Sequence, residues 1–278
     1  MKGPSVLTLV RNRSGHFDQL VEGLRRSSMV PGELVVVDMS DVAVAQPKTD
    51  FPVTMVRMAA EGLALAAARN RAVAAATGTD LVFLDVDCIP MRDCLSTLMA
   101  TLAGPGALVC ADVRYLGPED ARGSWDEAGL LAAGVAHPVR DFPTTGVRGE
   151  RNPGLFWSLA FAVRRSVFDR LGGFDERFAG YGAEDTDFGF RADAAGLPLL
   201  FVGGAIACHQ HHGSYDPPLQ HFADIVRNAR LFRDIWGFWP MQGWLDGFAA
   251  LGLIDVRDDA IAVLRPPAAD EIRASRQS

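Results

Sequence analysis

A run of apolar residues that ends in two carboxylates limits what this chain can fold into. Residues 81–90 read LVFLDVDCIP, with Asp85 and Asp87 directly after the apolar part. Consecutive apolar residues suit a strand buried on both faces, as in a mostly parallel sheet, and such sheets bind ligands beyond the carboxyl ends of their strands. Two carboxylates placed there can hold a divalent cation with coordination positions open for diphosphate oxygens. The pair also fits a solvated turn, because short acidic motifs are common by chance.

The segments around this run alternate between strand and helix patterns, which predicts an α/β domain with a mostly parallel sheet. The chain has 278 residues, of which 49% are hydrophobic, and this is ample for a sizeable core. Strand, polar loop and helix follow one another in the order of a βαβ unit. We expect strands at 5–10, 33–38, 52–56, 81–84 and 107–111, and helices at 17–26, 59–76 and 93–102.

Polar residues follow the first two expected strands and would share one edge of the sheet. Arg11 and Arg13 come after the first strand, where a guanidinium can contact a phosphate or a base, or can be a solvated loop charge. Asp38 ends the second strand, where a carboxylate can accept hydrogen bonds from a ribose or a uracil. Within the expected helix at 59–76, Arg69 is our candidate for a side chain that faces the same cleft.

Charge and cysteine content exclude some classes of protein. The formal net charge of -7 argues against a protein whose main task is to bind nucleic acid, since that task needs a basic surface. The four cysteines are scattered without the paired spacing of a metal site, so we expect reduced thiols. No secretory leader and no apolar run of about 18 residues occurs, so we expect a cytoplasmic protein without a membrane span.

A second group of polar residues lies in the sequence GGFDERFAGYGAEDTDFGFR. Glycines on both sides of Tyr181 allow a close backbone approach, and Glu184 and Asp185 then open an expected helix that ends at Gly196. The helix dipole favours carboxylates in a first turn by about 0.3–1 kcal/mol each, and it also helps to keep them ionised and able to accept a proton. A capping role and a functional role both remain open for this pair.

Three histidines, His209, His211 and His212, follow the two short strands expected at 199–202 and 205–208. Packing does not explain three histidines within four positions. His209 and His212 are three residues apart, so both could face one metal ion. The sequence does not decide which of the three is a ligand.

Four motifs now occur in an order that resembles a known family. Residues 10–13 (VRNR) resemble the F-R-N-R segment that holds the nucleotide in β-1,4-galactosyltransferases, and residues 85–87 (DVD) match their D-V-D metal motif. Residues 181–185 (YGAED) match their W-G-G-E-D motif, with Tyr for Trp and Ala for Gly. The family's last two ligands, Met and His, fall on His209 and His212. The chain therefore resembles a GT-A fold glycosyltransferase of the large family-two type, with a C-terminal half similar to the β-1,4-galactosyltransferase catalytic region.

This resemblance implies a fold, a reaction and partners. It implies a Rossmann-like GT-A domain at 1–215, with a mostly parallel central sheet flanked by helices. It also implies transfer of a sugar from a UDP-sugar donor to a hydroxyl acceptor with Mn²⁺ or Mg²⁺. The acceptor would be a saccharide, a lipid-linked molecule or a small molecule. Residues 112–151 lack a regular pattern, and we expect them to be a flexible acceptor loop or a tolerated insertion.

The resemblance also implies roles for individual residues. Asp185 matches the catalytic base, which implies inversion at the anomeric carbon, and Glu184 would hydrogen-bond the sugar or the acceptor. Together with Asp38 and Arg69 from the element pattern, the expected donor-binding residues are Arg11, Arg13, Asp38, Arg69, Asp85, Asp87 and Tyr181. The expected metal ligands are Asp87, Asp85, His212 and His209.

Departures from the family motifs limit which properties of the family can be assigned to this chain. His209 in place of Met makes the metal site harder, which could change its metal preference. Tyr181 in place of Trp changes the wall beside the donor sugar, so galactose specificity does not carry over. Thr186 interrupts the acidic run that opens the family's helix.

Three other functions remain open for this chain. A retaining glycosyltransferase on the same fold needs no base, so its acidic pair would serve only in binding. A sugar nucleotidyltransferase would show a glycine-rich basic phosphate loop after the first strand, where this chain has RNRSGH. A catalytically inactive nucleotide-sugar-binding module would not hydrolyse a UDP-sugar.

Residues 216–278 lie outside the resemblance and predict a helical C-terminal extension packed on the same domain. An amphipathic helix is expected near 219–236, followed by an aromatic, glycine-containing stretch. We interpret this segment as a packed cap or an acceptor platform. Its aromatic residues also suit a homodimer contact or a peripheral membrane contact, and they are Trp236, Phe238, Trp239 and Trp244.

Overall fold

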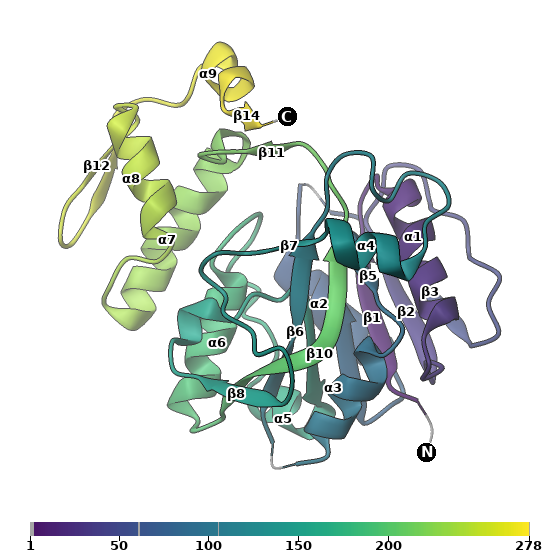
Figure 1. Ribbon diagram of the computed structural model, residues 1–278. Helices are drawn as coiled ribbons and strands as arrows, with labels where there is room; N and C mark the ends of the chain where they lie inside the picture. Colours follow the sequence, from purple (N-terminus) through teal and green to yellow (C-terminus); the bar gives the residue numbers. More distant parts are fainter. Residues whose placement is uncertain (1–2, 61, 105, 278) are drawn as a thin grey trace.

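A computed structural model describes residues 3–60, 62–104 and 106–277, and it contains a ten-stranded sheet with helices on both faces (Figure 1). The main strand order is β3-β2-β1-β4-β9-β6-β10-β5, with β7 paired to β6 and β8 paired to β10. The strands are β1 (Ser5–Val10), β2 (Glu33–Asp38), β3 (Val53–Arg57), β4 (Asp80–Leu84), β5 (Cys88–Pro90), β6 (Leu108–Tyr115), β7 (Val135–Ala136), β8 (Val147–Glu150), β9 (Ala160–Arg164) and β10 (Leu199–His209).

The N-terminal half of the sheet is parallel, which aligns the ends of its strands. β1 pairs in parallel with both β2 and β4, and Val10 lies opposite Asp38 in the register. Every residue of β1 and β2 is buried, because helices cover both faces of the sheet. The segments that follow β1, β2 and β4 therefore lie at one edge, as the sequence predicted.

Helices pack on the sheet as two separate hydrophobic layers. α1 (Ser14–Arg26) and α3 (Cys94–Leu102) bury leucines in one cluster. α2 (Leu65–Ala75), α5 (Arg165–Arg170) and α6 (Glu184–Ala194) bury alanines and phenylalanines in the other. The small side chains of α2 let this helix lie close to the strands. This architecture confirms the expected α/β class.

Three expected segments differ from the observed ones. The helix expected at 59–76 begins only at Leu65, because Gly62 has a φ of +76° outside the helical region. The two strands expected at 199–208 form one strand, β10, with a register shift between Val202 and Ile206. The intervening glycines form an irregularity within the strand and do not end it. Residues 112–151 are not irregular throughout, since they contain the end of β6, α4 (Glu127–Ala133), β7 and β8.

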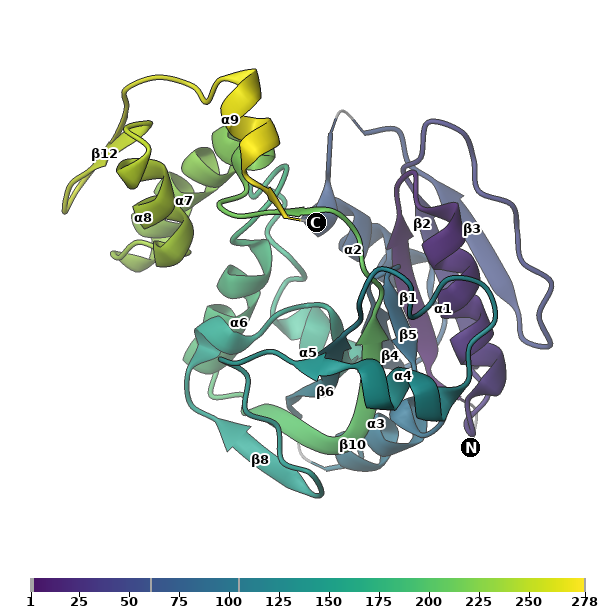
Figure 2. The same cartoon turned by 45° about the horizontal axis from the view of Figure 1, so that its top comes forward.

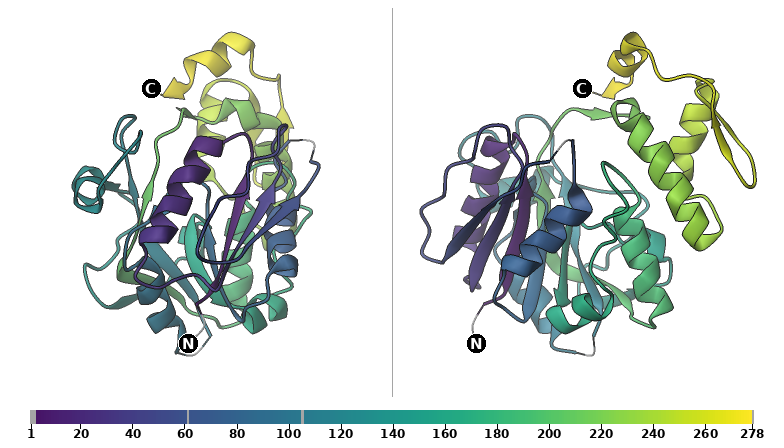
Figure 3. Two further views of the ribbon diagram at one scale, coloured as in Figure 1. Left: turned by 90° about the vertical axis from the view of Figure 1, so that its right-hand side faces the viewer. Right: turned by 180° about the vertical axis from the view of Figure 1, so that it is seen from behind.

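The C-terminal extension forms its own small core beside α6, at one end of the molecule (Figure 3). Its elements are β11 (Ser214–Tyr215), a 3₁₀ turn η2 (Leu219–His221), α7 (Phe222–Trp236), α8 (Gln242–Ala250), β12 (Ile254–Val256), β13 (Ile261–Val263), α9 (Ala269–Ala274) and β14 (Arg276–Gln277). None of the helices in the described ranges has the length and apolar character needed to cross a bilayer.

Hydrogen bonds join this extension to the loop and helix around α6. The Asn228 side chain donates to the carbonyls of Ala179, Tyr181 and Gly182 at 2.9, 3.2 and 2.8 Å. The Trp236 indole donates to the buried Asp187 carboxylate at 3.0 Å. The extension is therefore attached to the segment that carries the acidic pair.

A first prediction concerns Arg165, whose guanidinium closes the C-terminal end of α2. It donates to the carbonyls of Val73, Ala76 and Gly78 at 3.0, 2.8 and 2.9 Å. We expect Arg165→Ala to lower the free energy of unfolding by about 2–3 kcal/mol, because several charge-assisted hydrogen bonds are lost together. Urea denaturation measures this change. The exposed Arg170→Ala in the same helix is the control, and equal midpoints for both variants would contradict the prediction.

Candidate active site

Asp87, His209 and His212 form a compact group at the edge of the sheet. Cys88 of β5 pairs with His209 of β10, and the Gln210 amide donates to the Asp87 carbonyl at 2.7 Å, so backbone pairing brings the two segments together. His209 Nε2 lies 3.4 Å from Asp87 Oδ1, and His212 Nε2 lies 3.4 Å from Asp87 Oδ2. One ligand atom from each residue falls within 4.8 Å of the other two, so the three can hold one metal ion.

The charge states of this group suit a metal site. Burial alone would raise the pKa of Asp87, but His209, His212 and Arg13 together lower it below its usual range. Burial lowers the pKa of His209, which favours the neutral imidazole that binds a metal. One carboxylate and two imidazoles leave coordination positions free for oxygens of a ligand. The residues present therefore fit a divalent cation.

The predicted ligand Asp85 and the third histidine of the run, His211, lie differently. Asp85 is not part of this group, and its Oδ1 is 3.4 Å from Arg69 Nη2. Direct metal ligation by Asp85 stays a prediction. The backbone carbonyl of His211 faces the His16 ring at 3.4 Å, whereas the side chains of His209 and His212 face Asp87.

Arg69 joins the acidic strand end to the acidic helix. This side chain is buried, its Nη1 donates to Glu184 Oε1 at 3.0 Å, and the ring of Phe174 lies 5.1 Å from its guanidinium carbon. Burial raises the pKa of Asp85 to about 7, although the Arg69 charge opposes this shift. Residues 85 and 184 are far apart in the sequence, and Arg69 brings their carboxylates into one site.

Asp185 lies in the first turn of α6, next to Glu184. The turn that leads into the helix has Gly182 at a φ of +94° and Ala183 at +70°. Glu184, the first residue of the helix, accepts the hydrogen bond from Arg69. The Asp185 carboxylate accepts a hydrogen bond from its neighbour, Thr186 N, at 2.7 Å. Burial, followed by the Glu184 charge, raises the pKa of Asp185 to about 6. A carboxylate of this kind is ionised at neutral pH and is a stronger base than a solvated one.

The residues predicted to bind the donor make different contacts, and only some of them touch the group of Asp87, His209 and His212, here called the metal group. Arg13 forms an ion pair with Asp87, so its guanidinium lies next to the metal group. One nitrogen of Arg11, Nη1, is buried with no hydrogen-bond partner in the described part of the chain. Asp38 is buried and accepts bonds from the amides of Ser40 and Val44, and its contact with a ribose or a uracil stays a prediction.

An aromatic wall that the sequence did not predict lies beside Tyr181. The Tyr181 ring stacks on the His221 ring with centroids 4.3 Å apart. The centroids of the Tyr181 and Trp244 rings are 5.8 Å apart. The centroids of the Tyr115 and His209 rings are similarly 5.0 Å apart. The aromatic residues of the extension were a signal in the sequence, but nothing local to Tyr115 or His221 pointed to this site.

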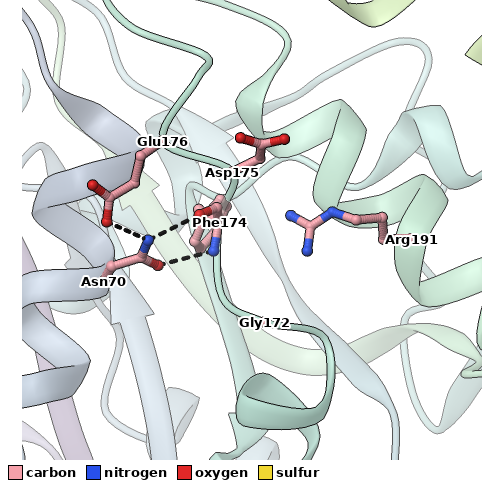
Figure 4. A pocket seen from close by; sticks show the side chains of 6 residues that line it. All are labelled: Asn70, Gly172, Phe174, Asp175, Glu176 and Arg191. Atoms are coloured by element: carbon pink, nitrogen blue, oxygen red, sulfur yellow. Dashed lines mark hydrogen bonds between the residues drawn. The ribbon is translucent and has the colours of Figure 1, made fainter. Parts of the chain in front are cut away.

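A cavity of about 380 Å³ lies beside α6 and is separate from this group (Figure 4). Asn70 donates to Phe174 O at 2.8 Å and to Glu176 Oε1 at 2.9 Å at its wall. Its lining contains none of the predicted site residues, and consists of Asn70, Gly172, Phe174, Asp175, Glu176 and Arg191.

Two family models match the chain. The family described as "Glycosyl transferase family 2" matches residues 5–172, and the one described as "N-terminal domain of galactosyltransferase" matches residues 151–212. The two matches overlap and together span the sheet, the acidic pairs and the histidines.

Curated relatives match parts of the chain. A validoxylamine A glucosyltransferase from Streptomyces hygroscopicus subsp. limoneus is 28% identical over 220 residues, which are 70% of this chain and 49% of that protein. An N-acetylglucosaminyl-diphospho-decaprenol L-rhamnosyltransferase from Mycobacterium tuberculosis is 34% identical over 107 residues, which are 37% of this chain and 34% of that protein. The chain thus spans half or less of the length of these curated relatives.

Among solved structures, GalNAc-T7 with UDP, GalNAc and Mn²⁺ superposes with a TM-score of 0.56 and 22% identity. The superposition covers 76% of this chain and 43% of that one. At this level of identity the likeness shows the fold alone.

Proposed function

This chain belongs to glycosyl transferase family 2, and on that premise we propose that it transfers a sugar from a UDP-sugar donor to a hydroxyl acceptor with inversion. The observation that carries this proposal is the Arg69 bridge. It joins Asp85, two residues from the metal ligand Asp87, to Glu184, the neighbour of Asp185. This bridge supports placing the proposed metal ligands and the proposed base in one site.

The chain's own residues supply binding and proton transfer. Arg13 and Arg11 would contact the donor diphosphate, and Tyr181 would form the wall beside the donor sugar. Mn²⁺ or Mg²⁺ bound by Asp87, His209 and His212 would neutralise charge on the diphosphate as it leaves. Glu184, held by Arg69, would accept hydrogen bonds from the sugar or the acceptor.

Asp185 would act as the base in a direct displacement. The acceptor oxygen forms a bond to the anomeric carbon while the bond from that carbon to the diphosphate oxygen breaks, and Asp185 takes the hydroxyl proton. Attack on the face opposite the leaving group inverts the configuration, so an α-linked donor yields a β-linked product. The relatives named above suggest a lipid-linked or small-molecule acceptor, and a saccharide is a third class.

A panel of nucleotide sugars tests the donor and the reaction together. Each donor is incubated with Mn²⁺ and a mixed set of acceptors, and the released nucleoside diphosphate is measured. We expect the largest release with UDP-sugars. Release from none of the donors, with or without acceptor, would favour an inactive nucleotide-sugar-binding module and would contradict the proposal.

We also expect UDP to bind more tightly with Mn²⁺ than with EDTA. Asp87, His209 and His212 would hold the metal, and its positive charge would stabilise the bound diphosphate, so UDP should bind less tightly when the metal is removed. Calorimetry with excess Mn²⁺ or excess EDTA measures the difference, and uridine without phosphates is the control ligand. Equal affinity for UDP under the two conditions would remove the metal from the donor site.

The pH dependence of turnover should report on Asp185. Its pKa is raised to about 6, and only the ionised carboxylate accepts a proton, so turnover should fall as the pH drops below about 6. Measurements at saturating Mn²⁺ separate this effect from loss of the metal. In Asp185→Asn, the residual turnover should lack this acid limb. An unchanged limb in that variant would assign the titration to another group.

A further inference from the structure

The C-terminal end of the chain returns to the loop that carries the metal-site histidines. β14 pairs antiparallel with β11, so Ser214 lies opposite Gln277 and Tyr215 lies opposite Arg276. β11 begins two residues after His212. Figures 1 and 2 show the C-terminus next to β11 from two directions. Residues separated by more than sixty positions therefore meet beside the metal group.

This tail is held in place by packing and hydrogen bonds. The Ser275 carbonyl accepts from the Asp216 amide at 2.8 Å, and Ser275 is buried. Ile272 of α9 packs against the core of the extension, and Glu271 pairs with Arg265 at 2.7 Å. The position of Arg276 is therefore set by its strand pairing and by the docked segment that precedes it.

The Arg276 guanidinium lies against Gly213, the residue directly after His212. A Cβ atom built on Gly213 would lie 3.2 Å from Arg276 Nε and 3.3 Å from Nη2. The absence of a side chain at residue 213 thus leaves room for this guanidinium beside the histidine loop. His212 Nε2 is in turn 3.4 Å from Asp87 Oδ2.

No acceptor satisfies this guanidinium within the described ranges. Arg276 is exposed and forms neither a side-chain hydrogen bond nor an ion pair with another residue there. Arg13, by contrast, is already paired with Asp87. An unpaired guanidinium next to a metal site suits an anion that the metal also contacts, and a diphosphate can accept two parallel hydrogen bonds from it.

We propose that Arg276 is a donor-binding residue that contacts the diphosphate of the bound nucleotide. This inference rests on the proposed function and assigns one further residue to its donor site. The contact makes donor affinity depend on the last residues of the chain, although they lie outside the segments that match the family models.

Calorimetry with UDP and Mn²⁺ tests the assignment in the chain of residues 1–278. We expect Arg276→Gln to raise the Kd for UDP about tenfold, the scale of one lost charge-assisted hydrogen bond. Arg276→Lys, which keeps the charge but not the planar fork, should lose less. Arg273→Gln, an exposed arginine three residues earlier in α9, is the matched control and should bind UDP like the wild type.

The affinity for Mn²⁺ alone separates a phosphate contact from support of the histidine loop. Removal of a positive charge beside the metal group should not weaken Mn²⁺ binding. Unchanged UDP affinity in Arg276→Gln would overturn the inference and leave the proposed function intact. Weakened binding of Mn²⁺ alone would also overturn it, by making Arg276 a structural support. A wild type that binds no nucleoside diphosphate with Mn²⁺ would overturn both proposals.

Discussion

Asp185→Asn should lower turnover by about 10²- to 10⁴-fold, the usual contribution of a general base. The substitution keeps the shape of the side chain and removes its ability to take the acceptor proton. The Thr186 amide can still donate to the remaining oxygen, so the start of α6 should persist. UDP and Mn²⁺ affinity should therefore stay close to the wild-type values while turnover falls.

Asp193→Asn is a matched control, because Asp193 lies in the same helix and is exposed. It should retain wild-type turnover. The anomeric configuration of the product, determined by NMR, is the second measurement. An α-linked product, or near-normal turnover in Asp185→Asn, would leave Asp185 as an acidic residue of the first helical turn and favour a retaining mechanism.

His212→Ala should weaken Mn²⁺ binding by more than about 10- to 100-fold, the loss typical when only an outer partner of a ligand is removed. His212 Nε2 faces Asp87 in the group that could hold a metal ion, so the substitution would remove one of the three proposed ligands. Titration of activity with Mn²⁺ should show a sharply higher metal requirement. Direct Mn²⁺ binding measured by calorimetry should show the same shift.

His211→Ala is the matched control for this prediction. The His211 side chain is not part of the group that faces Asp87, so its removal should change the metal requirement much less. Equal losses in the two variants would show that the ligands are assigned to the wrong histidines.

Much of the fold followed from local patterns in the sequence. The strands β1, β2 and β4 consist mainly of buried apolar residues, and polar residues lie at or directly after the carboxyl end of each, where the pattern placed them. Hydrophobic periodicity is a local property, so these elements could be located without the rest of the chain. The strand interrupted by Gly203 and Gly204 could not, because whether glycines end a strand or form an irregularity within it depends on the neighbouring strand.

The order of the motifs also identified the family, and the family model for residues 5–172 confirms it. Individual roles at the site remain predictions. Asp38 illustrates the difference, because its place at a strand end was predictable, whereas its bonds to the backbone amides of Ser40 and Val44 were not.

The sequence by itself determined which residues end the buried strands and which carboxylates open the acidic helix, because apolar runs and first-turn preferences act over a few residues. Only the tertiary structure decided which of them meet. Arg69 reaches Glu184 across 115 positions, and β14 brings Arg276 to the loop after His212. These contacts depend on long-range packing, in which burial of the core sets the distance between segments that share no local signal.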